Sequence, residues 1–445
     1  MERKNAWAAY AGDDGRVEAF AKAYCDFINN GKTERECVAY GEKLAKAHGF
    51  EDLNAVVRSG RKLEAGARVY ANWMGKSFML FVLGEKPLEE GMNILGAHID
   101  SPRIDVKQNP LYEDTDLAYL DTHYYGGIKK YQWVAIPLAL HGVIVRKTGE
   151  KVIINIGEDE NDPVFCISDL LVHLAQEQMT KNAKEVVEGE ALNLIVGGKP
   201  LEGEEKDAVK ANVLKLLADK YGVEEEDFLS AELEIVPAGK ARDMGFDRSM
   251  ILAYGHDDRV CAYPSMMAVL DYEGTPEYTL CCIVTDKEEI GSVGATGMAS
   301  HYLENTVAEL YACTADYCEL AVRRCLRNSR MLSSDVSAGY DPNFASAFEK
   351  KNSAFLGRGI CFNKFTGSRG KSGSNDANPE FMASLRKIMD DAGVAFQTAE
   401  LGRVDLGGGG TIAYLCAKYG MNVIDSGIPV LSMHAPYEVI SKVDL

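Results

Sequence analysis

The chain has 445 residues, and at about 150 residues per domain this length predicts two or three domains, or one large domain with an insertion. Hydrophobic residues make up 46% of the chain and charged residues 26%, which is the balance of an ordinary globular protein and not of a disordered or fibrous chain. The 48 basic and 67 acidic side chains give a net charge of −19. This negative field repels phosphates, so binding to nucleic acid or to an anionic membrane is disfavoured.

The sequence has no feature of a membrane or secreted protein. No apolar stretch approaches the ~18 residues of a membrane span. Residues 1–12 carry Glu2, Arg3 and Lys4 and no apolar core of a signal peptide. The 11 cysteines stand singly or as the pair Cys281-Cys282, without CxxC spacing, which is typical of small buried side chains in a reducing compartment. We therefore expect a cytoplasmic protein with neither a membrane nor a nucleic acid as its partner.

Two helices and two strands are predicted in the first hundred residues. Apolar side chains at three- and four-residue spacing over residues 17–28 predict the first helix. The second follows Thr33, which forms a capping box with Glu36, and ends near His48. Continuous apolar runs then predict strands of a sheet that is buried on both faces, at residues 78–83 and 93–97.

Residues 106–246 differ in character and are predicted to form an inserted domain. This segment contains β-like stretches at 133–140 and 143–145, a predicted helix at 169–178 and a charged patch at 202–207. After it, strands are predicted at 278–284, 310–315 and 422–424 and helices at 381–392 and 411–418. The alternation indicates an α/β domain that is discontinuous, over residues 1–105 and 247–445.

Histidine and carboxylate clusters stand where strands are predicted to end, which is where open α/β sheets place ligand sites. His98 ends the strand at 93–97 and is followed by Asp100, a spacing that allows the carboxylate to hold the second imidazole nitrogen. Glu288 and Glu289 follow the strand at 278–284. Adjacent carboxylates are costly to bury without a cation, although a solvated loop is the alternative.

Three further groups extend this set: Asp257-Asp258 after His256, Asp335 after two serines, and His434. Hydrolysis assisted by two metal ions needs about five ligands of the His, Asp or Glu type, including one bridging carboxylate, and a separate carboxylate as general base. The chain contains residues of these types in the required number.

In chain order the motifs are GAHIDSP at 96–102, HDDR at 256–259, DKEEIGS at 286–292, SSD at 333–335 and SMHAPYE at 432–438. With these motifs the sequence resembles the aspartyl aminopeptidase family of cocatalytic two-zinc metalloaminopeptidases. The third and fifth motifs are the most specific. The resemblance implies an α/β fold, with a catalytic domain whose mixed central sheet is flanked by helices and interrupted by a smaller β-rich dimerisation domain.

The resemblance also implies roles for individual residues. His98 and Asp335 would bind one zinc ion, Glu289 and His434 the other, and Asp257 would bridge the two. Glu288 would be the catalytic general base, and Asp100 would support His98. A cis peptide bond is expected after Asp257. The expected cofactor is two Zn²⁺ per subunit, and Mn²⁺ or Co²⁺ would suit the same ligands.

The expected substrates are peptides with a free N-terminus, whose first residue is acidic or neutral. Arg369 and Lys371 lie where relatives carry a basic substrate contact, and a flexible solvated loop is the alternative for each. The family forms dimer-based homo-oligomers, including a tetrahedral dodecamer, in which a histidine of the inserted domain reaches a neighbouring active site. His173 is the best match, and a structural histidine is the alternative.

Some features leave other functions open. Arg259 stands where acid-specific relatives have an apolar residue, so the choice between acidic and neutral substrates is not decided. A two-metal deacylase or carboxypeptidase would need a basic residue to bind a substrate carboxylate. A non-catalytic metal-binding assembly protein is a further alternative, and the presence of Glu288 argues against it. Residues 407–410 are all glycine but lack a P-loop lysine, so nucleotide binding is not expected.

Overall fold

The computed structural model describes residues 4–445, so Glu2 and Arg3 lie outside the described part. The chain divides into two compact units. The first comprises Met1–Asp100, Ala241–Met433 and Glu438–Leu445, and the second comprises Ser101–Lys240 and His434–Tyr437. The long segment of the second unit thus runs from 101 to 240, where the sequence predicted an insertion over 106–246. None of the helices in the described residues is long and apolar enough to cross a membrane.

The first unit is built on a mixed nine-stranded sheet, with the strand order β1-β2-β3-β13-β4-β14-β18-β16-β17. Strand β4 runs parallel to its neighbours β13 and β14, and β14 runs parallel to β18, whereas β3 and β16 are antiparallel to their neighbours β13 and β18. The strands are β1 Glu51–Asp52, β2 Arg68–Trp73, β3 Ser77–Val82, β4 Met92–His98, β13 Thr279–Thr285, β14 Arg330–Ser334, β16 Ile360–Asn363, β17 Phe396–Thr398 and β18 Asn422–Gly427. The carboxyl ends of the parallel strands β4, β13 and β14 therefore meet at one edge of the sheet.

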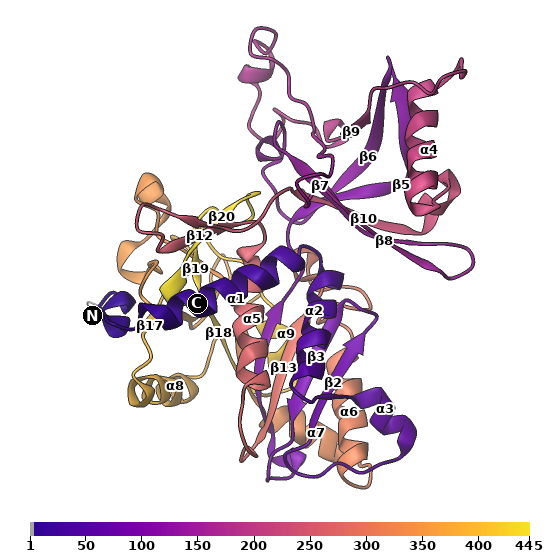
Figure 1. The fold of residues 1–445 in the computed structure, drawn as a ribbon. Coiled ribbons are helices and arrows are strands. Elements are labelled where there is room, and N and C mark those ends of the chain that lie inside the picture. The colour runs from indigo at the N-terminus through magenta and orange to yellow at the C-terminus, as the bar shows by residue number, and fades with distance from the viewer. Residues whose placement is uncertain (1–3) are drawn as a thin grey trace. The chain divides into compact units, whose positions relative to one another are not determined.

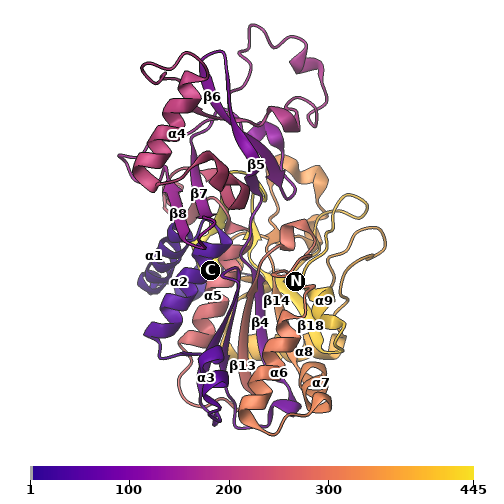
Figure 2. The ribbon, with the colours of Figure 1, turned by 90° about the vertical axis from the view of Figure 1, so that its right-hand side faces the viewer.

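Helices cover both faces of this sheet (Figure 2). One face packs against α1 Asp14–Asn30, α2 Glu34–Ala47 and α5 His256–Leu270, and the other against α3 Leu53–Ser59, α6 Tyr302–Thr314, α7 Glu319–Asn328 and α9 Ala413–Ala417. In β3, Phe78 and Leu80 contact the first group of helices, and Met79 and Phe81 contact the second. All six residues of β3 are buried, which confirms a strand with two covered faces.

Smaller elements complete the first unit. Helix α8 Pro379–Ala392 packs through Leu385 on the side of the sheet formed by β16, β17 and β18. A three-stranded sheet contains β11 Arg242–Met244, β12 Met250–Ala253 and β20 Glu438–Ser441, and a two-stranded sheet contains β15 Ser337–Ala338 and β19 Pro429–Val430.

The second unit is β-rich, as expected. Its antiparallel six-stranded sheet contains, in spatial order, β8 Lys151–Ile156, β7 Leu138–Val145, β10 Ala231–Pro237, β5 Arg103–Asp114, β6 Leu117–Tyr125 and β9 Leu194–Gly197. Helix α4 Ala208–Tyr221 lies beside this sheet (Figure 1). A side chain at Gly197 would lie 2.7 Å from Val213 of α4, so the glycine allows the helix to pack closely on β9.

The N-terminal predictions are confirmed in detail. Helix α2 begins with the predicted capping box, in which Thr33 accepts a hydrogen bond from the backbone of Glu36 and the Glu36 carboxylate bonds back to Thr33. His48 is the C-terminal capping residue, and its Nδ1 lies 2.8 Å from the Leu44 carbonyl oxygen.

Three local predictions are wrong. The predicted strand at 310–315 lies mostly within helix α6, where Leu310 and Cys313 are buried, because a short apolar run fits a buried helix as well as a strand. Residues 169–177 form turns and irregular chain in place of the predicted helix, and Gln178 begins the short 3-10 helix Gln178–Thr180. The predicted strand at 133–140 begins only at Leu138, since Trp133 ends the short 3-10 helix Lys130–Gln132.

Candidate metal centre

Four segments of the first unit bring histidine and carboxylate side chains together. His98 ends β4, Glu288 and Glu289 follow β13 in the 3-10 helix Glu288–Ile290, and Asp335 follows β14. Because these strands are parallel neighbours, the three segments emerge at the same edge of the sheet. Asp257 and Asp258 come from the first turn of α5, which packs on one face of the sheet.

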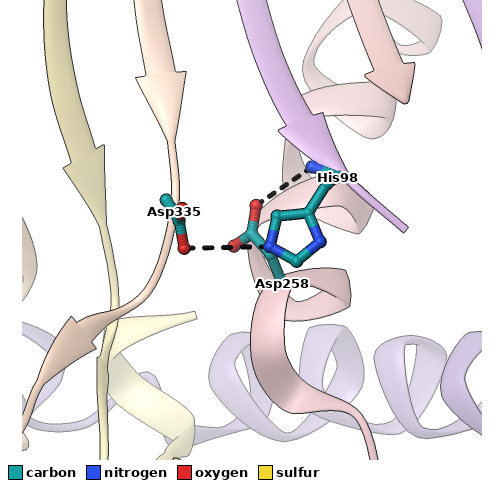
Figure 3. A group of neighbouring side chains, drawn as sticks. All are labelled: His98, Asp258 and Asp335. Carbon is teal, nitrogen blue, oxygen red and sulfur yellow. Dashed lines mark hydrogen bonds and ion pairs between the residues drawn. The ribbon is translucent and has the colours of Figure 1, made fainter. Parts of the chain in front are cut away.

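The distances around His98 define the centre. Its Nε2 atom lies 3.3 Å from Asp257 Oδ1, 3.9 Å from Asp335 Oδ1 and 4.0 Å from Glu288 Oε2. Two groups that contain His98 offer one ligand atom per residue within 4.8 Å of one another: His98, Asp257 and Glu289, and His98, Asp258 and Asp335. Figure 3 shows the second group, in which His98 points toward the two carboxylates.

Asp100 holds both His98 and the backbone of the glutamates. His98 Nδ1 lies 3.0 Å from the Asp100 carbonyl oxygen and 3.3 Å from its Oδ1. The two carboxylate oxygens of Asp100 accept hydrogen bonds from the backbone N–H groups of Glu288 and Glu289, each at 3.1 Å. The Asp100 oxygens beside His98 Nδ1 favour a proton on that nitrogen and leave Nε2 of His98 as the metal-binding nitrogen. Asp100 is fully buried, so one carboxylate fixes the geometry of two segments.

The segment of Asp257 and Asp258 is held by hydrogen bonds on both sides. Glu438 accepts a bond from the Asp257 N–H at 2.9 Å, and Asp258 accepts one from the His98 N–H at 3.2 Å (Figure 3). The peptide bond between the two aspartates is cis, as the resemblance implied. Sequence reasoning assigned no role to Asp258 or Glu438, although Asp258 adjoins Asp257 and Glu438 belongs to the SMHAPYE motif.

Burial and like charges shift the pKa values of the centre. Burial raises the pKa of Asp258, and burial together with the Asp258 charge raises the pKa of Asp335. Burial lowers the pKa of His98, but hydrogen bonds to Asp100 and Asp257 outweigh this and hold it well above its ordinary value. A divalent cation would relieve the repulsion between the carboxylates. One imidazole nitrogen among carboxylate oxygens is a ligand set that suits zinc, so the residues present fit this ion.

The other predicted site residues lie outside these two groups. His434 belongs to the second unit, where its Nδ1 lies 2.9 Å from the Gly127 carbonyl oxygen. His173 is exposed in the turns of the same unit. Arg369 and Lys371 are exposed in a loop of the first unit, and Lys371 forms an ion pair of 3.0 Å with Asp376. The functional roles of these four residues stay predictions.

Comparison with known proteins identifies the family. The family model of the aminopeptidase I zinc metalloproteases (M18) matches residues 27–445. The chain belongs to the M18 family. A protein of Clostridium acetobutylicum named probable M18 family aminopeptidase 1 is 58% identical over 448 residues, which are 100% of this chain and 96% of that protein. This M18 member is therefore a zinc metallopeptidase with aminopeptidase activity, which the resemblance of the sequence motifs predicted.

Solved M18 structures share the complete fold. The crystal structure of the M18 aminopeptidase from Thermotoga maritima superposes with a TM-score of 0.94 at 44% identity, covering 100% of this chain and 96% of that one. Aminopeptidase I from Clostridium acetobutylicum gives a TM-score of 0.92 at 56% identity, with the same coverage. The S. cerevesiae mApe1 dodecamer shares the fold at 21% identity, with a TM-score of 0.76 over 96% of this chain and 94% of that one.

Proposed function

We propose that this M18 aminopeptidase removes N-terminal residues from peptides with a free amino group, using two zinc ions per subunit. His98 and Asp335 would bind one ion, Glu289 and His434 the other, and Asp257 would bridge them. The observation that carries this proposal is the approach of His98 Nε2 to Asp257 at 3.3 Å and to Asp335 at 3.9 Å in a buried setting. When bound, the ions would supply Lewis acidity toward the scissile carbonyl group and the attacking water.

Glu288 is proposed as the general base. Its carboxylate stands outside both groups of candidate ligands, with Oε2 at 4.0 Å from His98 Nε2. The side chain is half-buried, and the backbone N–H of the residue is fixed by Asp100. Glu288 would accept the proton of the attacking water at a carboxylate oxygen and deliver it to the leaving amine. Asp100 would keep His98 in the tautomer and orientation that metal binding needs.

The replacement Glu288→Gln tests this assignment. Leu-, Glu- and Asp-p-nitroanilides serve as substrates of the zinc-loaded protein, and Glu304→Gln in helix α6 serves as the control. We expect kcat to fall by about 10²–10⁴ in the Glu288 variant, while metal analysis still finds two zinc ions per chain. Retention of wild-type kcat would refute the base assignment, and fewer than two bound ions in the wild type would refute the two-ion site. Reconstitution with Mn²⁺ and Co²⁺ compares the other candidate cofactors.

The requirement for a free amine has its own test. The N-acetylated forms of the same p-nitroanilides should not be hydrolysed, because an aminopeptidase site binds the free α-amino group of its substrate. Turnover of the acetylated forms would favour the deacylase alternative. We further propose that Arg369 and Lys371 contact the substrate side chain.

The subunits are proposed to form a homo-oligomer through the second unit, with a dimer as the building block and a dodecamer as the largest assembly. His173 would reach the active site of a neighbouring subunit. The exposed apolar side chains around it, Leu171 at 54%, Val172 at 75% and Leu174 at 67%, support an interface. Light scattering on the purified protein should give the mass of a multimer, and His173→Ala should lower activity without changing that mass. A monomeric mass would refute the proposal.

The cytoplasm is the proposed location. Eleven cysteines are free in the described chain, and eight of them are buried, which fits a reducing compartment. Cell fractionation that places the protein in the periplasm or outside the cell would refute this location.

A further inference from the structure

Arg259 is a fully buried arginine directly after the two aspartates of the candidate centre. Its exposed fraction is 0%, and it lies in α5 one residue beyond Asp258. Burying a guanidinium group is costly unless its N–H groups find acceptors. Arg259 Nε donates a hydrogen bond to the Ile99 carbonyl oxygen at 3.0 Å, and Nη2 donates one to the Lys32 carbonyl oxygen at 2.9 Å. Its guanidinium carbon also lies 5.4 Å from the centre of the Tyr254 ring.

The first acceptor of Arg259, the Ile99 carbonyl oxygen, lies in the segment between two residues of the candidate centre. Ile99 lies between His98, which faces the carboxylates, and Asp100, which holds His98 and the glutamate backbone. The N–H of Ile99 donates to the Thr285 carbonyl oxygen at 2.9 Å, at the end of β13 and three residues before Glu288. One peptide segment therefore joins β4 to β13, and the Arg259 side chain joins the same segment to α5.

The second acceptor, Lys32, lies in a fixed part of the chain. The N–H of Lys32 donates to Glu36 Oε2 at 3.0 Å, and the same oxygen accepts from the Thr33 N–H in the capping box of α2. The two N–H groups of the Arg259 guanidinium, here called the Arg259 fork, thus connect the residue before the capped start of α2 with the loop after His98. A lysine could not reproduce this contact, because one ammonium group lacks the planar fork that reaches two acceptors in fixed directions.

We infer that Arg259 is a positioning residue of the zinc centre, which holds the Asp257-Asp258 segment and the His98–Asp100 segment at the separation that metal binding requires. This inference rests on the proposed zinc ligands. Arg259 is fully buried, and the two hydrogen bonds described above go to backbone carbonyl groups, so it acts on the ligands and not on the substrate. Loss of the fork would let the two segments separate, which would weaken zinc binding and lower kcat with little effect on KM.

The test compares Arg259→Met and Arg259→Lys with the same replacements of a matched arginine, Arg68 of strand β2, whose side chain contacts the opposite end of α5. Arg68 donates from Nη1 to the Leu270 carbonyl oxygen at 3.1 Å and from Nη2 to the Tyr272 carbonyl oxygen, at and just beyond the other end of α5. It also lies 5.5 Å from the Phe50 ring. Arg68→Met and Arg68→Lys therefore remove the same kind of contact far along the helix from the zinc ligands.

The first measurement is the concentration of dipicolinate that removes half of the bound Zn²⁺ from the intact protein. Supporting residues of metal sites typically change metal affinity by about 10–100-fold. We expect Arg259→Met to release zinc at a dipicolinate concentration lower by about this factor, Arg259→Lys to be intermediate, and both Arg68 variants to match the wild type. The visible absorption bands of the Co²⁺-loaded protein should change in Arg259→Met alone, since they report ligand geometry.

The outcomes separate this inference from the proposed function. A folded Arg259→Met variant with wild-type zinc retention and an unchanged Co²⁺ spectrum would overturn the inference, as would equal losses in the Arg259 and Arg68 variants. If Arg259→Met does not fold, Arg259→Lys decides, and wild-type zinc retention in that variant would overturn the inference. A wild-type protein that binds no zinc would instead refute the proposed function.

Discussion

Glu438 accepts a hydrogen bond from the backbone N–H of Asp257, with 2.9 Å between Oε2 and N. Glu438 begins β20 and is 1% exposed, and Asp257 stands in the first turn of α5. The contact joins parts of the chain that are 181 residues apart. Glu438 thereby fixes the backbone of Asp257, the candidate bridging ligand. Glu438 itself belongs to none of the candidate ligand groups among the described residues.

Replacement of Glu438 should separate this hydrogen bond from the charge. Glu438→Ala leaves the buried Asp257 N–H without this acceptor, at a cost of about 1–3 kcal/mol in the free energy of unfolding, and should also lower kcat/KM. Glu438→Gln keeps an acceptor oxygen, so we expect a smaller loss of both. Urea unfolding and steady-state kinetics of the two variants measure the difference. Equal losses in the alanine and glutamine variants would contradict a role for the hydrogen bond.

Gly427 should not tolerate a side chain. It ends β18, and a Cβ atom there would lie 1.8 Å from the backbone carbonyl oxygen of Asp335. Backbone atoms cannot rotate away, so Gly427→Ala must displace the segment that carries Asp335. We expect a loss of about 1–3 kcal/mol in the free energy of unfolding and weaker zinc binding.

Gly15 provides the control for this prediction. It lies in α1, and a Cβ atom there would meet no atom within 4 Å. Gly15→Ala should stabilise the protein by about 0.5–1 kcal/mol, because alanine loses less backbone entropy in a helix. Thermal unfolding and zinc titration of both variants check the pair. A Gly427→Ala protein with wild-type stability and zinc affinity would show that the Asp335 segment can shift freely.

The main parts of the fold follow from local sequence patterns. The capping box joins Thr33 to Glu36, which are near neighbours in the chain. The apolar run of β3 indicates burial of both faces of the strand, whichever elements pack on it. Both features can therefore be predicted before the topology is known. The strand predicted at residues 310–315 was wrong because the prediction also used only a local pattern. Its burial was evident, but six apolar residues do not distinguish a strand from one turn and a half of a buried helix.

The positions of the candidate ligands that follow strands were predictable from the sequence, whereas the long-range contacts around them were not. His98, Glu289 and Asp335 each stand at or just after the end of a strand, so the parallel sheet brings them together. The contacts of Glu438 with Asp257 and of Arg259 with Lys32 depend on the packing of α5 against distant segments. No spacing rule relates residues 181 or 227 positions apart, so only the folded chain reveals them.

Asp425 should make stability depend on pH. Burial raises the pKa of this carboxyl group to about 7, and the hydrogen bond that Thr411 donates at 2.5 Å opposes the shift only in part. The ordinary value in an unfolded chain is about 3.9. The folded state therefore binds the proton more tightly, and this contribution to stability is fully present below about pH 4 and is lost as the pH rises through 7.

Urea unfolding at pH 5 and pH 8 tests this prediction. The wild type should lose more stability between the two values than Asp425→Asn, which cannot ionise and retains an acceptor for Thr411. Asp390→Asn, on the exposed side of helix α8, is the control and should follow the wild type. Parallel profiles for the wild type and Asp425→Asn would contradict ionisation of Asp425 as the cause.

The choice between acidic and neutral substrates should depend more on Arg369 than on Lys371. Lys371 shares Asp376 with Lys364 and lies 4.0 Å from the centre of the Phe365 ring, so its charge is already engaged. Arg369 is exposed in the same loop. An arginine contact with a carboxylate is a strong charge-assisted hydrogen bond, worth about 1.5–3 kcal/mol.

Three single variants resolve this choice. Arg369→Gln should lower kcat/KM for Glu- and Asp-p-nitroanilide by about tenfold or more, as that bond energy implies, and leave Leu-p-nitroanilide unchanged. Lys371→Gln should have a smaller effect. Lys364→Gln breaks the other ion pair of Asp376 and controls for loosening of the loop. If the ratio of Glu to Leu hydrolysis is the same in Arg369→Gln as in the wild type, Arg369 does not select acidic residues, and the choice that Arg259 of the HDDR motif left open is not made by this side chain.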